Sequence, residues 1–313
     1  MWNEEDIEKH FSTYFEQADN ISNNSQTWYI RVFWGSLISL VVSAGLGCIS
    51  GILNEKNHAQ TILIINVIII VLIIISVICT IVIHQSKLQK YWYDGRAVAE
   101  SLKTMSWKYI NSASPYDHAD IKGANFQFAN DLKLILQSHE DIVNEINCLS
   151  HVRKDIITDE MQSFRQLNWE SKKKIYLEQR IDGQLSWYTS KTRYNTRRKN
   201  FWFIFSIIIQ IIALGSILYV FSNSNFSADL VGFFSSTSAT VASWIQVKRY
   251  QELQQSYSTT ALELNFIYHE GTQVDNELKF LEFVANAEKA ISREHTLWIA
   301  RRDNTKLENM ISQ

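Results

Sequence analysis

Four long apolar stretches, arranged as two close pairs, constrain this 313-residue chain more than any other feature. The first pair covers residues 28–53 and 61–83, and the second covers residues 201–221 and 230–247. A helix needs about 20 apolar residues to cross the roughly 30 Å hydrocarbon core of a bilayer, and each stretch approaches or exceeds that length. The pattern predicts an integral membrane protein with four transmembrane helices in two hairpins.

The remaining sequence also favours helices. Pro115 is the one proline, and ten glycines leave little of the turn chemistry that short strands require. We therefore expect an all-α protein whose charged segments form long helical stalks outside the bilayer. Residues 28–53 are expected to be a retained span and not a cleaved leader, because the preceding residues are acidic.

The distribution of Lys and Arg predicts the orientation. The short connection over residues 54–60 holds one lysine, and residues 222–229 hold none. Because cytoplasmic flanks of membrane spans carry an excess of basic residues, both termini and the middle of the chain are expected to be cytoplasmic. The basic flanks contain Lys87, Lys90, Arg96, Arg193, Arg197, Arg198, Lys199, Lys248 and Arg249.

Two matching signals indicate an internal duplication. A Phe-Trp pair opens the first stretch at Trp34 and the third at Trp202, and a heptad of apolar residues follows each pair of stretches. We predict a first two-transmembrane unit over 1–113, a cytoplasmic linker over 114–157 and a second unit over 158–313. The heptad positions are Leu88, Tyr91, Gly95, Val98, Leu102, Met105 and Tyr109 in the first copy, and Tyr250, Leu253, Tyr257, Thr260, Leu264 and Ile267 in the second.

Each heptad creates a seam that another helix must cover, as in a coiled coil. In the first copy, residues 61–111 are expected to form one continuous helix of about 75 Å. The seam either packs against the helix that enters the first span of the same copy, or joins stalks of several subunits in a bundle. Within the linker, residues 122–128 are expected to be loop-like, and helical spacing returns over 131–148.

The first stretch carries small residues at every fourth position. Such a stripe lets two helix backbones approach closely within a bilayer, where packing must supply the association energy. We expect helix packing at Gly35, Ser39, Ser43, Gly47 and Gly51. The second stretch is apolar almost all round and is expected to face lipid.

The fourth stretch is more polar than the others along one helical face. That face is either a second packing stripe or the wall of an aqueous pore, in which an acidic residue at the outer mouth would favour cations. In the pore interpretation the same stripe of a neighbouring subunit would face it. The residues are Asp229, Gly232, Ser236, Thr240, Ser243 and Gln246.

Motifs of catalysis do not occur. The sequence lacks GxGxxG, GxxxxGK[ST], HExxH and GxSxG. We expect no enzyme, no cofactor, no metal site and, at a net charge of −2, no nucleic-acid partner. Cys48, Cys79 and Cys148 are expected to be free thiols. The basic run at 172–174 is expected to be a solvated helix face, and positive-inside topology with anionic headgroups explains the run at 197–199.

Two segments resemble a known family. Residues 92–109 (WYDGRAVAESLKTMSWKY) resemble the motif after the transmembrane pair of bacterial SLATT domains, and residues 176–191 (YLEQRIDGQLSWYTSK) resemble the motif before the pair in a second variety. On their own, four residues of the first segment also fit i,i+4 ion pairing with an interfacial anchor. They are Arg96, Glu100, Lys103 and Trp107. The stalk motif comprises Arg96, Glu100, Lys103, Trp107, Arg180, Gln184, Trp187 and Tyr188.

The resemblance implies a function. SLATT domains are two-transmembrane effector modules associated with SMODS nucleotide synthases and SLOG sensors. The resemblance implies a homo-oligomeric pore-forming effector of bacterial antiviral conflict that crosses the inner (plasma) membrane several times. A cytoplasmic signal would open the pore by acting on the stalks. A separately encoded sensor or nucleotide synthase would supply that signal. The alternative is a non-conducting membrane scaffold that docks cytoplasmic partners through its stalks.

Overall fold

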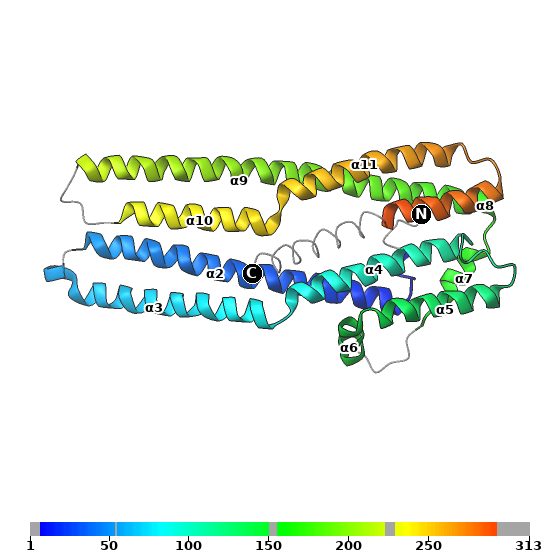
Figure 1. Cartoon of the computed structure of the whole chain (residues 1–313), viewed down its shortest axis with the longest axis horizontal. Coiled ribbons are helices and arrows are strands. Elements are labelled where there is room, and N and C mark those ends of the chain that lie inside the picture. Colours follow the sequence, from blue (N-terminus) through cyan, green and yellow to red (C-terminus); the bar gives the residue numbers. More distant parts are fainter. Residues whose placement is uncertain (1–6, 54, 150–154, 223–228, 293–313) are drawn as a thin grey trace, which may run out of the picture. The chain divides into compact units, whose positions relative to one another are not determined.

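The computed structural model describes residues 7–53, 55–149, 155–222 and 229–292, and no strand occurs in these ranges. The predicted all-α class is therefore confirmed (Figure 1). The helices are α2 (Thr13–Ile52), α3 (Glu55–Gln85), α4 (Leu88–Ile110), α5 (Ile121–Gln137), α6 (Glu140–Leu149), α7 (Asp159–Arg165), α8 (Trp169–Ile175), the π-helix η1 (Tyr176–Ile181), α9 (Asp182–Ser222), α10 (Leu230–Lys248) and α11 (Tyr250–Thr272), followed by a helix over 277–292.

The chain divides into two compact units. Unit 1 combines residues 1–26, 89–191 and 255–313, and unit 2 combines residues 27–88 and 192–254. Long helices such as α2 and α9 contribute residues to both units. Each unit thus draws on both halves of the sequence.

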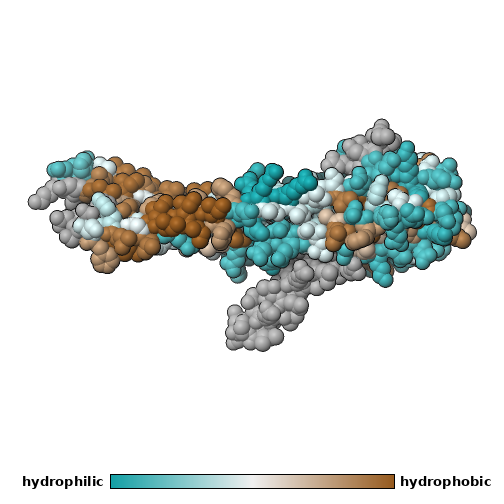
Figure 2. Space-filling model, turned by 90° about the horizontal axis from the view of Figure 1, so that it is seen from above, coloured by the Kyte–Doolittle hydropathy of each residue, from teal (hydrophilic) through white to brown (hydrophobic). Residues whose placement is uncertain are grey.

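Unit 2 holds the apolar helices. By length and composition, three helical stretches could cross a membrane: Thr13–Ile52, Asn57–Ile110 and Trp169–Ser222. Apolar side chains dominate this unit in Figure 2. The helix α10, whose 19 residues include several Ser and Thr, is not one of the three. The arrangement of four spans in two hairpins therefore stays a prediction.

Small side chains bring the helices of unit 2 together. The Ser36 and Ser76 hydroxyls form a hydrogen bond of 2.9 Å between α2 and α3, and both residues are buried. A Cβ at Gly45 of α2 would lie 3.2 Å from the ring of Phe233 in α10. The helices α2 and α10 therefore approach each other closely at a glycine, as small-residue packing in membranes allows.

The predicted continuous helix over 61–111 is wrong at one point. Lys87, between α3 and α4, has a φ of 50°, and Arg249, between α10 and α11, has a φ of 49°. An L-residue in this left-handed region ends an α-helix. Each break lies one residue before the first heptad position of its copy, so both stalks begin as separate helices.

The seam of the first stalk is covered within the chain. Gly95 of α4 sits against α2, where a Cβ would lie 3.0 Å from the carbonyl oxygen of Ala18. The Ser22 hydroxyl donates a 2.8 Å hydrogen bond to the Trp92 carbonyl at the same contact. The seam residues Val98 and Leu102 are fully buried. The seam therefore packs against the helix that enters the first span of the same copy, which was the first of the two alternatives.

Residues 122–128 are helical, which corrects the loop-like expectation. Asp120 caps the N-terminus of α5 by accepting a hydrogen bond from the Lys122 amide. Phe128 is fully buried, with its ring 5.0 Å from that of Tyr109 and 5.6 Å from that of Tyr116. Aromatic packing onto α4 therefore stabilises α5.

Candidate functional site

The polar face of α10 is only partly covered by the packing of unit 2. Val241 and Trp244 are the buried residues of this helix, whereas Ser236 and Gln246 are exposed. The other predicted residues of the stripe, Gly232, Thr240 and Ser243, are half-buried. Packing inside the described chain therefore covers this face only in part.

The hydroxyls of this face are satisfied within α10. Ser236 donates to the Gly232 carbonyl at 2.7 Å, and Ser243 donates to the Ala239 carbonyl at 2.9 Å. Each hydroxyl oxygen keeps lone pairs that can accept a further bond. The face can therefore contact water, ions or another polar helix without breaking its own bonds.

Asp229 has a structural role that the sequence analysis missed. Its carboxylate accepts a 2.7 Å hydrogen bond from the Gly232 amide and caps the N-terminus of α10. A carboxylate is favourable at this end of a helix because of the helix dipole. An Asp three residues before a Gly at the start of an apolar run was the available signal. Asp229 remains exposed, so its charge still faces the surroundings.

The small-residue stripe of α2 packs along only part of its length. Ser39 and Ser43 are buried, and a Cβ at Gly35 would lie 3.6 Å from the Cys79 sulfur. Gly47 has no heavy atom of the described chain within 4 Å of a Cβ position, so its packing role stays a prediction. Gly51 is half-buried. Cys48 and Cys79 are free thiols, and the side chain of Cys148 lies outside the described part.

Three indoles gather in unit 2. The ring centroids of Trp34 and Trp244 lie 4.3 Å apart, and those of Trp202 and Trp244 lie 6.1 Å apart. These residues come from α2, α9 and α10, so the two tryptophans that marked the duplication meet at a third. Aromatic pairs at such separations stabilise helix contacts beyond their buried area.

A buried ion pair organises unit 1. Arg180 of η1 is 1 % exposed and Glu288 of the helix over 277–292 is fully buried. The Arg180 Nε and Nη2 groups donate to the two carboxylate oxygens of Glu288 at 2.9 and 3.0 Å. The Tyr176 hydroxyl also donates to this carboxylate at 3.0 Å. The pair is bidentate and hydrogen-bonded, as a buried charge pair must be to be tolerated.

The two segments that resemble SLATT motifs meet at this ion pair. The Arg180 guanidinium lies 5.8 Å from the ring of Trp107, which is fully buried. Lys103 forms a salt bridge with Glu8, whose carboxylate lies 4.0 Å from Arg180. The cluster therefore joins the N-terminal segment, α4, η1 and the helix over 277–292. We call Glu8, Lys103, Trp107, Tyr176, Arg180 and Glu288 the buried charge cluster.

The remaining motif residues lie outside the cluster. Arg96 and Glu100 form the expected i,i+4 ion pair at 3.3 Å. Trp187 and Tyr188 each place their rings 5.5 Å from that of Tyr257, on the seam of the second stalk. Gln184 lies half-buried on α9.

Glu288 lies outside every motif and repeat of the sequence. The residues beside it on its helix, Val284, Ala287 and Ile291, are all buried. A carboxylate within an apolar helical face was the signal that could have found it, because such a group requires a buried cationic partner.

Lys172 is buried, which corrects the expected solvated face at 172–174 for this residue. Its Nζ donates a 3.2 Å hydrogen bond to the Ser112 hydroxyl. Burial, followed by the nearby charge of Arg165, lowers the pKa of Lys172 to about 8. Arg165 itself donates to the carbonyls of Tyr109 and Tyr116 and fixes the end of α4.

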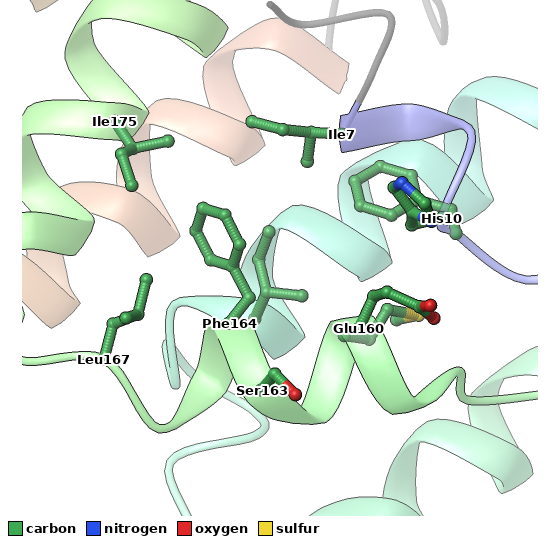
Figure 3. A pocket seen from close by; sticks show the side chains of 10 residues that line it. Ile7, His10, Glu160, Ser163, Phe164, Leu167 and Ile175 are labelled. Atoms are coloured by element: carbon green, nitrogen blue, oxygen red, sulfur yellow. The ribbon is translucent and has the colours of Figure 1, made fainter. Parts of the chain in front are cut away.

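A largely apolar cavity of about 290 Å³ lies in unit 1 beside the buried charge cluster. In Figure 3 the side chains of Ile7, Phe164 and Ile175 surround it, with His10 and Glu160 at one side. Phe11, another lining residue, places its ring 5.9 Å from Trp107. Among the described residues no Lys or Arg lines the cavity, so this lining suits an apolar group and offers little to a phosphate.

Comparison with known proteins matches two consecutive parts of the sequence to two models of one family. Residues 13–173 match the SMODS and SLOG-associating 2TM effector domain 3, and residues 176–298 match the SMODS and SLOG-associating 2TM effector domain 1. No curated protein and no solved structure matches the chain. The two matches confirm the resemblance that the motif segments carried. The chain therefore belongs to the SLATT family of SMODS and SLOG-associating two-transmembrane effector domains, and it holds two such domains in tandem.

Proposed function

We propose that this protein is a non-enzymatic, pore-forming effector of a bacterial conflict system. Four helices of unit 2 span the inner membrane as two hairpins, both termini are cytoplasmic, and several copies assemble into a ring. A separately encoded sensor or nucleotide synthase provides the signal, which acts on unit 1. SLATT domains are effector domains associated with such systems.

The exposed polar face of α10 carries this proposal. Ser236 and Gln246 lie on it and are exposed, while lipid tails cannot hydrogen-bond to polar side chains. In a bilayer this face requires either the matching face of another copy or water. A ring of copies supplies both, because a closed cyclic assembly can place the same face of each copy around one axis.

The buried charge cluster is the proposed switch. It joins four separate segments of unit 1 around one ion pair between Arg180 and Glu288. Removing one partner from a buried pair leaves an uncompensated charge, so the cluster favours two states, fully paired or opened. A protein that displaces the N-terminal segment through Glu8 would favour the second state.

Conductance measurements with purified protein in planar bilayers test the proposal. Discrete current steps are expected, and Asp229→Asn should lower the preference for cations while keeping the helix cap. Cysteine accessibility gives an independent test: a thiol placed at Ser236 should react with water-soluble reagents, whereas one at the buried Val241 should not. Equal reactivity at both positions, or no current under any condition, would contradict a pore.

One observation favours the scaffold alternative. Leu262 and Phe266 lie one turn apart on α11 and are 58 % and 66 % exposed. An exposed apolar pair on a helix surface is typical of protein contacts. If the protein is a scaffold, Ser236→Leu should alter assembly or stability without affecting any current, and Phe266→Ser should abolish partner binding.

A further inference from the structure

Two cations of unit 2 stack on aromatic rings, one within α9 and one at the C-terminal end of α10. The guanidinium of Arg198 lies 5.4 Å from the ring centroid of Tyr194, and the ammonium of Lys248 lies 5.0 Å from that of Trp244. Stacking on an aromatic face holds each side chain in place. Both cationic groups are therefore positioned and not freely rotating.

The two positive charges lie close together. Burial first, and then the charge of Arg198, lower the pKa of Lys248. Tyr250, which is 5 % exposed, is close to Arg198 and to the indole of Trp244, so the groups form one cluster. No carboxylate of the described residues forms a salt bridge with Arg198 or Lys248, while the neighbouring Arg249 is paired with Glu252. Two adjacent unpaired cations form a favourable site for an anion.

The first copy of the repeat lacks both cations. Arg198 lies four residues before Trp202, and the corresponding position before Trp34 is Ile30. Lys248 lies two residues before the start of the second heptad, where the first copy has Ser86. A general excess of basic residues on the cytoplasmic side applies to both copies, so it does not explain why the second copy alone concentrates charge here.

An apolar track leads away from Arg198 along the same face of α9. Phe201 and Phe205 follow Arg198 by three and seven residues, which is helical spacing on one face. Their rings stack at 6.1 Å, and the residues are 54 % and 37 % exposed. A cationic end followed by an exposed apolar track matches a molecule with an anionic head and an apolar tail.

We propose that Arg198 and Lys248 together bind the phosphate group of an anionic membrane lipid, whose acyl chain lies over Phe201 and Phe205. Arg and Lys contact phosphate oxygens through charge-assisted hydrogen bonds, the strongest class in proteins. A free phosphate ion would use the same two cations but would leave the aromatic track uncovered. This site does not depend on whether α10 lines a pore.

Lipid binding to the full-length protein tests the proposal. Dioctanoyl-phosphatidylglycerol is titrated into protein in a neutral detergent, and bound lipids are counted by native mass spectrometry. Parallel titrations use dioctanoyl-phosphatidylcholine and inorganic phosphate. Wild type is expected to bind the anionic lipid in preference to both. The affinity of R198Q/K248Q for this lipid should fall by roughly tenfold or more.

The matched control removes the same charge nearby. Arg193 and Arg197 are exposed on α9, and R193Q/R197Q should bind the lipid as wild type does. Equal weakening in both double variants would overturn the site in favour of general surface charge, and equal affinity for inorganic phosphate would overturn the lipid as its ligand. If R198Q/K248Q fails to fold, Arg198→Gln alone, at an exposed position, is tested instead. A several-fold loss of lipid affinity is expected, and unchanged binding would contradict the proposal. R198K/K248R, which keeps both charges, should retain binding.

Discussion

Lys87 and Arg249 share a left-handed backbone conformation at equivalent points of the two tandem domains, with φ values of 50° and 49°. Each residue separates an apolar helix from its stalk, since Lys87 precedes α4 and Arg249 precedes α11. The Arg249 amide still donates a hydrogen bond to the Ile245 carbonyl, so this carbonyl in the last turn of α10 keeps a hydrogen-bond partner. The two domains thus retain the same backbone device although their sequences have diverged.

At these breaks a glycine variant should be more stable than a valine variant. Valine in the left-handed region is expected to cost about 1–2 kcal/mol more than glycine at Lys87 and at Arg249, because a β-branched side chain clashes there. Gln89, an exposed helical neighbour, is the control, and there glycine should be the less stable of the two. Thermal unfolding in detergent measures the order. If the helix were continuous at residue 87 or 249, the glycine variant there would be the less stable of the two, as at Gln89.

Loss of the carboxylate in the buried charge cluster should be severe. Glu288→Gln leaves the buried Arg180 without its ionic partner, which typically costs about 3–5 kcal/mol. Glu282→Gln on the same helix, at an exposed position, should change stability by less than about 0.5 kcal/mol. Similar melting temperatures for the two variants would show that the ion pair contributes little.

Lys172 should make stability depend on alkaline pH. Because its pKa falls to about 8 in the folded protein, the unfolded chain binds more protons between about pH 8 and pH 10.5. Stability from this group therefore rises with pH across that window and is lowest below it. Lys172→Met should be more stable than wild type at pH 7, and the difference should shrink toward pH 10.5. Lys174→Met, at an exposed position, should leave the pH dependence unchanged.

Two glycines should respond oppositely to the same substitution. Gly95→Ala places a Cβ 3.0 Å from the Ala18 carbonyl oxygen and 3.2 Å from the Ser22 amide nitrogen, which are backbone atoms. We expect a loss of about 1–3 kcal/mol. Gly123→Ala meets only the His118 side chain at 3.5 Å and should gain up to about 1 kcal/mol from helix propensity. Chemical unfolding of the two variants measures both signs, and a neutral Gly95→Ala would contradict close packing of α4 on α2.

Periodicity predicted the helices and the buried face of the first stalk correctly, because an apolar repeat reflects local geometry. Val98 and Leu102 are buried as their spacing required. The break at Lys87 was not predictable in this way, since lysine is an ordinary helix residue and the left-handed conformation depends on tertiary packing. The helix over 122–128 was missed because Gly123 weakened the pattern and its stabilising contacts come from distant aromatic rings.

The buried charge cluster shows the same limit. The motif segments identified Lys103, Trp107 and Arg180, but helical spacing could relate each only to neighbours on its own helix. Arg180 and Glu288 are separated by 108 residues, and no periodicity reports a contact of that range. The polar face of α10 was readable from the sequence because its residues lie on one helix.

The order of the cluster residues along the chain has a consequence for biosynthesis. Arg180 leaves the ribosome 108 residues before Glu288, and at about 5–20 residues per second the delay is roughly 5 to 20 s. During that interval Arg180 lacks its bidentate partner Glu288, and α9, α10 and α11 are all synthesised. The core of unit 1 is completed only when its last helix emerges, so a nascent or truncated chain cannot assemble the switch.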